Sequence, residues 1–237
     1  MLKNVQGTST ILPFYWILTI YGLQYATYTD AFTVLVGVEE ENFILHWSIA
    51  VAHSKFFRAA CNGQFKEAQE KVIRLPDIKP SIFRAYLQWI YSGHVVVLTA
   101  AGLSADHKGI DSRVELVKLY ALADVLADTP LRNRIIDEIR ASLVEHQMGF
   151  GVRAICFAYE NAPARCTLHR LIVDHNVHNS KTYTTWFEDY RTKLPSEFFT
   201  DLAIGISKTG WERPPHPRDA ARCTYHEHDD ECPKCVD

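Results

Sequence analysis

The stretch from Phe32 to Tyr91 decides the fold, and it opens with two short apolar runs, Phe32-Thr-Val-Leu-Val-Gly37 and Asn42-Phe-Ile-Leu-His46. Three acidic residues, Glu39–Glu41, separate the two runs. A glycine and an acidic turn between two such runs predict a hairpin of half-buried strands. A helical segment, a third short strand and a helix with aromatic residues on its inner face follow. Because the strands are few and short, the pattern predicts a small sheet capped by helices on one side rather than a doubly wound sheet.

The next elements are predicted by periodicity and by helix-end signals. Between residues 48 and 60 apolar side chains recur every three or four positions, which predicts a helical stripe facing the core, with a break into two helices around His53-Ser54. Alternation over Lys71–Leu75 predicts a strand. Pro80 and Gly93 mark the two ends of the aromatic helix, since proline favours the first helical turn and glycine the position after the last.

Further along, the β-branched run Val95–Leu98 predicts another short strand, and the glycine-containing stretch 99–111 predicts a loop. A helix capped at Asp111 or Ser112 follows, and its apolar residues on nearly all sides predict burial. Thr129-Pro130 then predicts the N-cap and first turn of a second helix with one apolar face.

This order of motifs resembles the BTB (or POZ) domain family, and in particular the stand-alone BTB proteins of fungi. The matching segments are Phe43–His46, Ala52–Cys61, Phe65–Val72, Leu75–Asp77, Tyr86–Gly93 and Leu116–Leu143. They extend over roughly half of the chain. The resemblance implies an α+β fold, the BTB/POZ fold, in which a small sheet of short strands is capped by a cluster of helices. Trp47 departs from the pattern, because the family usually has lysine there.

Four regions are expected along the chain. Residues 1–29 form an N-terminal extension whose apolar run resembles the core of a signal peptide. Lys3 is the only positive charge before that run and the cleavage site is poor, which favours an extra packed segment or a non-native start. Residues 30–147 form the BTB/POZ domain, and residues 148–204, in which no strand signal recurs, form an all-helical extension. Residues 205–237 form a flexible linker rich in glycine and proline, followed by a Cys/His tail.

Composition limits the class of protein. The net charge of −3 and the isoelectric point near 6.4 show no basic bias, which argues against nucleic acid as a partner. The apolar run near the N-terminus is too short to span a membrane and contains Pro13, so no membrane partner is expected. The six cysteines are too sparse for a disulfide scaffold, and three of them crowd the C-terminus. We therefore expect a reduced protein of the cytoplasm or the nucleus.

The tail contains the candidate metal ligands. Cys223 and His226 form a Cys-x2-His pair, and Cys232 and Cys235 form a Cys-x2-Cys pair, with His228 as a substitute for His226. Four such ligands suit tetrahedral zinc. The alternative is a disordered polar tail in which the cysteines have no special role. No cofactor other than this candidate zinc is expected.

No enzyme is expected. The chain lacks the nucleophile-elbow, P-loop, dinucleotide-binding and zinc-protease motifs. His175 and His178 share a helical face but lack an evident third ligand, and Cys61, Cys156 and Cys166 lack a neighbouring basic or histidine pattern that would activate a thiol.

The resemblance implies a protein–protein interaction module. In the family this domain commonly forms homodimers, and in many members it docks a cullin ubiquitin ligase scaffold through a hydrophobic residue, any residue and then Glu, before the third strand. Phe65-Lys66-Glu67 matches that motif, so Phe65 and Glu67 are the candidate cullin-binding residues. A substrate adaptor would have to capture its unknown substrate protein with residues 148–237. The alternatives are a dimerising scaffold or transcription-complex component without cullin binding and, more distantly, a zinc-dependent enzyme.

Overall fold

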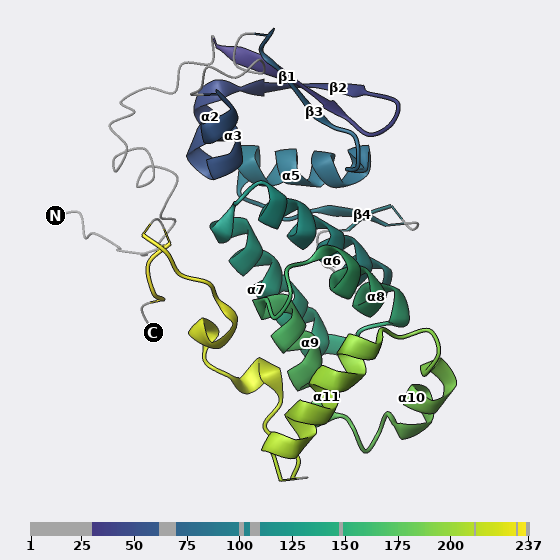
Figure 1. Cartoon of the computed structure of the whole chain (residues 1–237). Helices are drawn as coiled ribbons and strands as arrows, with labels where there is room; N and C mark the ends of the chain where they lie inside the picture. Colours follow the sequence, from purple (N-terminus) through teal and green to yellow (C-terminus); the bar gives the residue numbers. More distant parts are fainter. Residues whose placement is uncertain are drawn as a thin grey trace, which may run out of the picture.

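The computed structural model describes residues 30–61, 70–99, 102–104, 110–146, 149–210, 212–230 and 232–235. A small sheet lies at one end of the molecule, helices are stacked away from it, and the C-terminal tail runs back along one side of the stack (Figure 1). This is an α+β fold followed by helices, as the sequence predicts.

The sheet has three strands in the order β2-β1-β3, and they are β1 (Ala31–Val36), β2 (Glu41–His46) and β3 (Val72–Leu75). β1 and β2 are antiparallel, which confirms the hairpin, and β3 lies parallel to β1. Alternate residues of β1 face the core, where Val34 is completely buried. Gly37 has a φ of 77° at the hairpin turn, a conformation that glycine adopts without strain.

The predicted break in the first helical segment is confirmed. α2 (Trp47–His53) and α3 (Lys55–Cys61) meet at Ser54, which is fully buried. The Ser54 hydroxyl accepts a hydrogen bond from the Phe57 amide (3.0 Å), which caps α3, and it donates one to the Leu126 carbonyl (2.7 Å). The break therefore has a local cause, the cap, and a long-range anchor.

α5 (Pro80–Ser92) begins and ends where the sequence predicts, and Gly93 follows it with a φ of 71°. The loop expected over residues 99–111 is only partly correct. β4 (Val97–Thr99) pairs with a second short strand, β5 (Gly102–Ser104), in a two-stranded antiparallel sheet. A strand of three residues is too short to leave a period-two pattern in the sequence.

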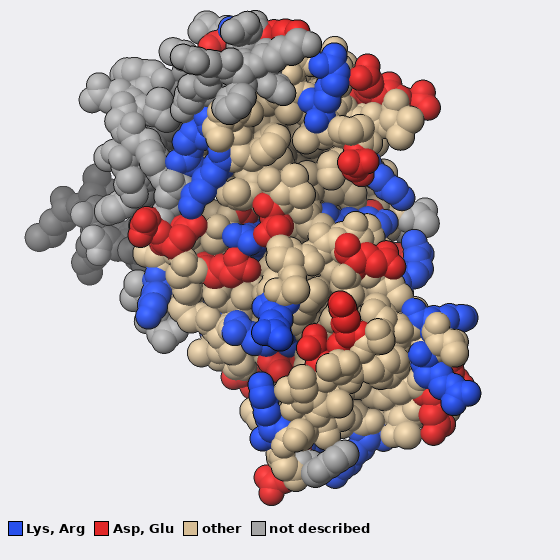
Figure 2. Space-filling view, viewed as in Figure 1, with Lys and Arg blue, Asp and Glu red and all other residues tan. Residues whose placement is uncertain are grey.

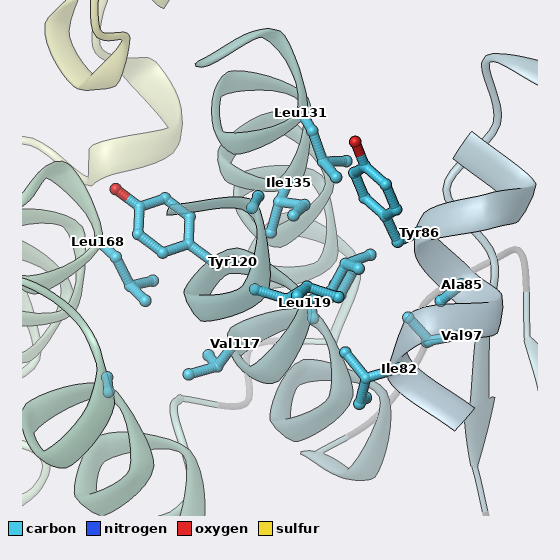
Figure 3. Packing of buried hydrophobic residues seen from close by; sticks show 14 of the residues in the cluster. Ile82, Ala85, Tyr86, Val97, Val117, Leu119, Tyr120, Leu131, Ile135 and Leu168 are labelled. Carbon is cyan, nitrogen blue, oxygen red and sulfur yellow. The ribbon is translucent and has the colours of Figure 1, made fainter. Parts of the chain in front are cut away.

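α6 (Ile110–Val125) is the central helix, and it contacts α5, α7 (Thr129–His146) and α8 (Val152–Asn161). Figure 3 shows Leu119 of α6 facing Ile82 of α5, whereas Tyr120 points away towards Leu168. Burial on several sides explains why apolar residues surround this helix. The cap of α7 differs from expectation: Asp128, one residue earlier than Thr129, accepts a hydrogen bond from the Leu131 amide (2.9 Å).

The extension is helical, as predicted. Its helices are α8, α9 (Thr167–His178), α10 (Thr184–Tyr190) and α11 (Ser196–Lys208), followed by the short 3₁₀ turns η1 (Pro217–Asp219) and η2 (Arg222–Tyr225). The expected linker start at 205 lies inside α11. A Cβ atom on Gly205 would lie 2.7 Å from a methyl group of Val177, so this glycine allows α11 to approach α9 closely.

Residues 1–29 lie outside the described part of the chain, so the role expected for that extension stays a prediction. Among the described residues, no helix is both long enough and apolar enough to cross a membrane.

Candidate functional site

The tail from η1 onwards lies against α7 and α9 and makes specific polar contacts with both helices (Figure 1). Arg140 of α7 donates hydrogen bonds to the carbonyl oxygens of Pro217 (3.2 Å), Arg218 (3.3 Å) and Ala220 (2.5 Å). Basic and acidic side chains are interspersed over the face on view in Figure 2. Backbone carbonyl groups of the tail are therefore held by a side chain of α7.

Asn133 makes the most specific of these contacts. Its side-chain amide donates a hydrogen bond to the Glu227 carbonyl (2.8 Å) and accepts one from the Glu227 amide (2.8 Å), as a neighbouring strand would. The Glu227 carboxylate pairs with Arg132 (2.9 Å) and accepts a hydrogen bond from the Tyr120 hydroxyl (3.0 Å). Glu227 is thus fixed through both its backbone and its side chain.

Tyr225 anchors the tail on α9. Its ring is buried, and the guanidinium groups of Arg140 and Arg170 lie 5.5 and 5.4 Å from the ring centroid. Its hydroxyl donates a hydrogen bond to Asp174 (2.8 Å). Burial and the Asp174 carboxylate both raise the pKa of Tyr225. The phenol therefore stays neutral, and two cation–π contacts hold its ring.

Cys223, His228 and Cys235 are brought together at the end of the tail. One ligand atom from each lies within 4.8 Å of the others. Among the described residues, these three form the group that could hold a metal ion. The Cys235 amide donates a hydrogen bond to the Cys223 sulfur (3.1 Å). Thiol and imidazole donors at this separation are suited to a soft or borderline divalent metal.

His226 lies beside this group and links it to α7. One ring nitrogen, Nδ1, is 3.1 Å from the Cys235 sulfur, and the other, Nε2, is 3.0 Å from Asp137 Oδ1. The His226 side chain is only 4% exposed. Arg222 also pairs with Asp137 (2.8 Å), so the carboxylate receives two partners from the tail.

Cys232, a predicted ligand, is not part of the cluster. Its sulfur lies 3.4 Å from the amide nitrogen of Asn133, and burial raises the pKa of the Cys232 thiol. Of the four predicted ligands, the structure brings Cys223 and Cys235 together with His228 and places His226 next to them. His228 entered the sequence analysis only as a substitute.

The candidate cullin-binding residues, Phe65 and Glu67, lie in residues 62–69, outside the described part of the chain. In the sequence this segment falls after the end of α3 at Cys61 and before the start of β3 at Val72. Its role in binding a cullin stays a prediction.

The structure adds a histidine cluster that the spacing of His175 and His178 only hints at. The His216 ring, from the segment before η1, lies edge-on to both, with ring centroids 5.2 Å from His175 and 4.7 Å from His178. Burial and the neighbouring imidazoles lower the pKa of His175 to about 3 and that of His216 to about 4. The His175 and His216 rings therefore pack as neutral groups.

The thiols of the extension are not poised for nucleophilic chemistry. Burial, and secondarily Glu160, raises the pKa of Cys156, and burial raises the pKa of Cys166. A nucleophilic cysteine needs a lowered pKa. This agrees with the expectation that neither thiol is a catalytic nucleophile.

Residues 24–131 match the family model of the BTB/POZ domain. This chain contains a BTB/POZ domain. The mouse Kelch repeat and BTB domain-containing protein 4 is 34% identical to it over 98 residues, which are 41% of this chain and 16% of that protein. The human protein of the same name is 39% identical over 62 residues, which are 26% of this chain and 12% of that protein.

The mouse TD and POZ domain-containing protein 1-like is 27% identical over 97 residues, which are 41% of this chain and 26% of that protein. The similarity thus spans about a quarter or less of each relative. The BTB/POZ family is generally a family of interaction modules rather than enzymes, so a role in protein–protein interaction follows. The likeness to fungal members stays a prediction.

Proposed function

We propose that this protein is a self-associating interaction module that acts as a substrate adaptor for a cullin-based ubiquitin ligase. The observation that carries the proposal is the BTB/POZ domain at residues 24–131, followed by a further set of helices. The names of the relatives pair a BTB or POZ domain with a second module, Kelch or TD. In this chain, α8 to α11 and the tail take the second position and are the candidate substrate-binding part.

Cullin docking is assigned to Phe65 and Glu67. An aromatic side chain that fills a pocket in a partner supplies much of the binding energy of an interface, and a nearby carboxylate favours one orientation of the complex.

A pull-down of the purified full chain with a cullin N-terminal domain tests this assignment. The double variant Phe65→Ala/Glu67→Lys is expected to lose binding, whereas Glu188→Lys, the same charge reversal at an exposed position of α10, is expected to keep it. If folded wild-type protein does not bind any cullin, the adaptor function is wrong. The chain would then be a dimerising scaffold or a transcription-complex component.

Self-association is supported by the sheet. β2 is an edge strand, and Ile44 on its outer face is 70% exposed. An exposed edge with an apolar side chain favours pairing with another chain. Light scattering should give about twice the mass of the 27.1 kDa chain. A monomer mass at every concentration tested would remove the homodimer from the proposal.

We further propose that the Cys/His group of the tail binds zinc as a structural ion. The zinc-dependent enzyme remains the alternative, and it requires an activity that is lost on chelation. A structural ion instead changes the stability of the tail without supporting a reaction.

A further inference from the structure

The imidazole ring of His228 has one buried nitrogen atom, Nε2, that makes no hydrogen bond. Its Nδ1 lies 3.1 Å from the Pro233 carbonyl oxygen and so donates its hydrogen there. The other nitrogen, Nε2, then carries a lone pair, and it is buried without any hydrogen-bond partner. A buried acceptor without a partner is destabilising. Donation from one ring nitrogen to a carbonyl, with the other left free, is the arrangement of metal-bound histidine.

His226 shows the same arrangement with its nitrogens exchanged. Nε2 donates to Asp137 Oδ1 at 3.0 Å, which leaves the lone pair on Nδ1, 3.1 Å from the Cys235 sulfur. A carboxylate that orients a histidine in this way also makes it a stronger metal ligand.

We propose that Cys223 Sγ, Cys235 Sγ, His226 Nδ1 and His228 Nε2 bind one zinc ion, and that Asp137 of α7 orients His226 so that the ion fastens the tail to the helical stack. The inference rests on the zinc binding proposed for the tail and is independent of cullin docking. Two thiolates and two imidazoles match the ligand set of tetrahedral zinc. The Cys235 amide, 3.1 Å from the Cys223 sulfur, stabilises the negative charge of that thiolate.

The spacing of the donor atoms agrees with one ion. With Zn–S near 2.3 Å and Zn–N near 2.0–2.1 Å, tetrahedral ligand atoms lie roughly 3.3–3.8 Å apart. The His226–Cys235 pair is slightly closer, at 3.1 Å, and the atoms of Cys223, His228 and Cys235 lie within 4.8 Å of one another. His226 does not lie within 4.8 Å of all three of these residues, so its side chain has to move to complete the site.

Two other arrangements compete with this ligand set. The first replaces His228 by Cys232, as the Cys-x2-Cys spacing suggests, but the Cys232 sulfur faces Asn133. The second is a disulfide between Cys223 and Cys235, whose sulfurs are close enough to be joined after a small movement. Both have distinct experimental signatures.

The test measures the zinc-to-protein ratio of the full chain purified under reducing conditions without chelator. The wild type and the matched control Cys232→Ser should each contain about one zinc ion. Cys223→Ser, Cys235→Ser and His228→Ala should lose it, and circular dichroism checks that each variant is folded. Asp137→Asn, which keeps every ligand, should weaken zinc binding by roughly 10- to 100-fold in competition with a chromogenic chelator.

Each contrary result overturns a defined part of the proposal. Reduced wild-type protein without zinc, which also takes up none when zinc is added, would remove metal binding by the tail altogether. Zinc lost in Cys232→Ser but kept in His228→Ala would restore Cys232 as the ligand. A mass 2 Da below the reduced mass, with Cys223 and Cys235 in one linked peptide, would show a disulfide instead.

Cobalt substitution of the wild type decides the ligand set even if the variants do not fold. The intensity of the thiolate-to-cobalt charge-transfer band follows the number of thiolates. Two thiolates are expected, and three would contradict the assignment of His228. Failure of this test leaves the cullin pull-down unaffected, and the reverse is also true.

Discussion

Replacing Asn133 by alanine should release the tail from α7. Asn133 is 6% exposed, and it makes two hydrogen bonds of 2.8 Å, one to the backbone carbonyl and one to the amide of Glu227. Alanine leaves both backbone groups facing a methyl group. The other contacts of Glu227, with Arg132 and Tyr120, use its side chain and do not replace them.

The size of the effect follows from the burial of the groups left unpaired. A polar group that is buried without a partner costs about 1–3 kcal/mol. Glu227 is half-buried, so water partly replaces each lost bond. We therefore expect a loss of about 2 kcal/mol in the free energy that holds the tail closed, which corresponds to a roughly 30-fold increase in its open population.

Hydrogen exchange of the Glu227 amide, which donates to Asn133 in the wild type, reports the loss of this protection. The control is Asn161→Ala, because the Asn161 side chain is exposed and bonds only to the Phe157 carbonyl within α8. The exchange is measured with and without a chelator, so that a metal contribution is seen separately. If Asn133→Ala changes the exchange rate of Glu227 by less than about threefold in chelator, the hydrogen bonds do not hold the tail as described.

Three further changes test the core and its titratable groups. Burial lowers the pKa of His175 to about 3, so as the pH falls below 6.5 the unfolded chain takes up a proton before the folded one does. Wild type should lose up to about 2 kcal/mol of folding stability between pH 6.5 and 5 relative to His175→Gln. If urea unfolding gives the same change of unfolding free energy with pH for both proteins, this prediction is wrong. Arg113 is completely buried, and its Nε and Nη2 atoms make no hydrogen bond. Arg113→Met should therefore leave the midpoint of urea unfolding unchanged or raise it. A clear decrease of the midpoint would show that the charge of Arg113 is compensated in the folded protein. Leu119→Ala should cost about 2–5 kcal/mol, and a loss below about 1 kcal/mol would mean that α6 is not the packed centre in solution.

The comparison between His175→Gln and wild type is needed because Asp128 acts in the opposite direction. Burial raises the pKa of Asp128 to about 7, although hydrogen bonds from Leu131 and Trp89 partly oppose the shift. The folded chain therefore holds this proton more tightly than the unfolded one, and stability is lost as the pH rises from about 3.8 towards 7. The two effects partly cancel in the wild type.

The sheet and the first helices could be predicted because their causes are local. The hairpin depends on alternation on both sides of Gly37, and the ends of α5 depend on Pro80 and Gly93. The break at Ser54 is a cap that the neighbouring residues form by themselves. Each of these signals lies within a few residues of the feature that it predicts.

The cap of α7 shows where local signals become ambiguous. Asp128 and Thr129 are both good caps, and the sequence around them does not choose between them. The choice is made by Trp89, 39 residues away, whose indole donates a hydrogen bond to Asp128 (3.2 Å). The docking of the tail is a stronger case, since its anchors, Asn133 and Arg140, lie on a helix about 80–95 residues earlier in the chain.

The ligand set of the tail depends on a turn that Cys-x2-Cys spacing does not reveal. The amide of Cys232 donates to the Asp229 side chain (2.7 Å), and the backbone groups of the two residues bond to each other (3.1 and 3.2 Å), which closes a turn over residues 229–232. The turn brings His228 and Pro233 together across its base. It therefore places His228 and Cys235 on one side and directs the Cys232 sulfur to Asn133. Pairs of ligands in a tail without regular secondary structure are chosen by such turns, so Asp229→Ala should weaken zinc binding although Asp229 contributes no atom to the proposed site.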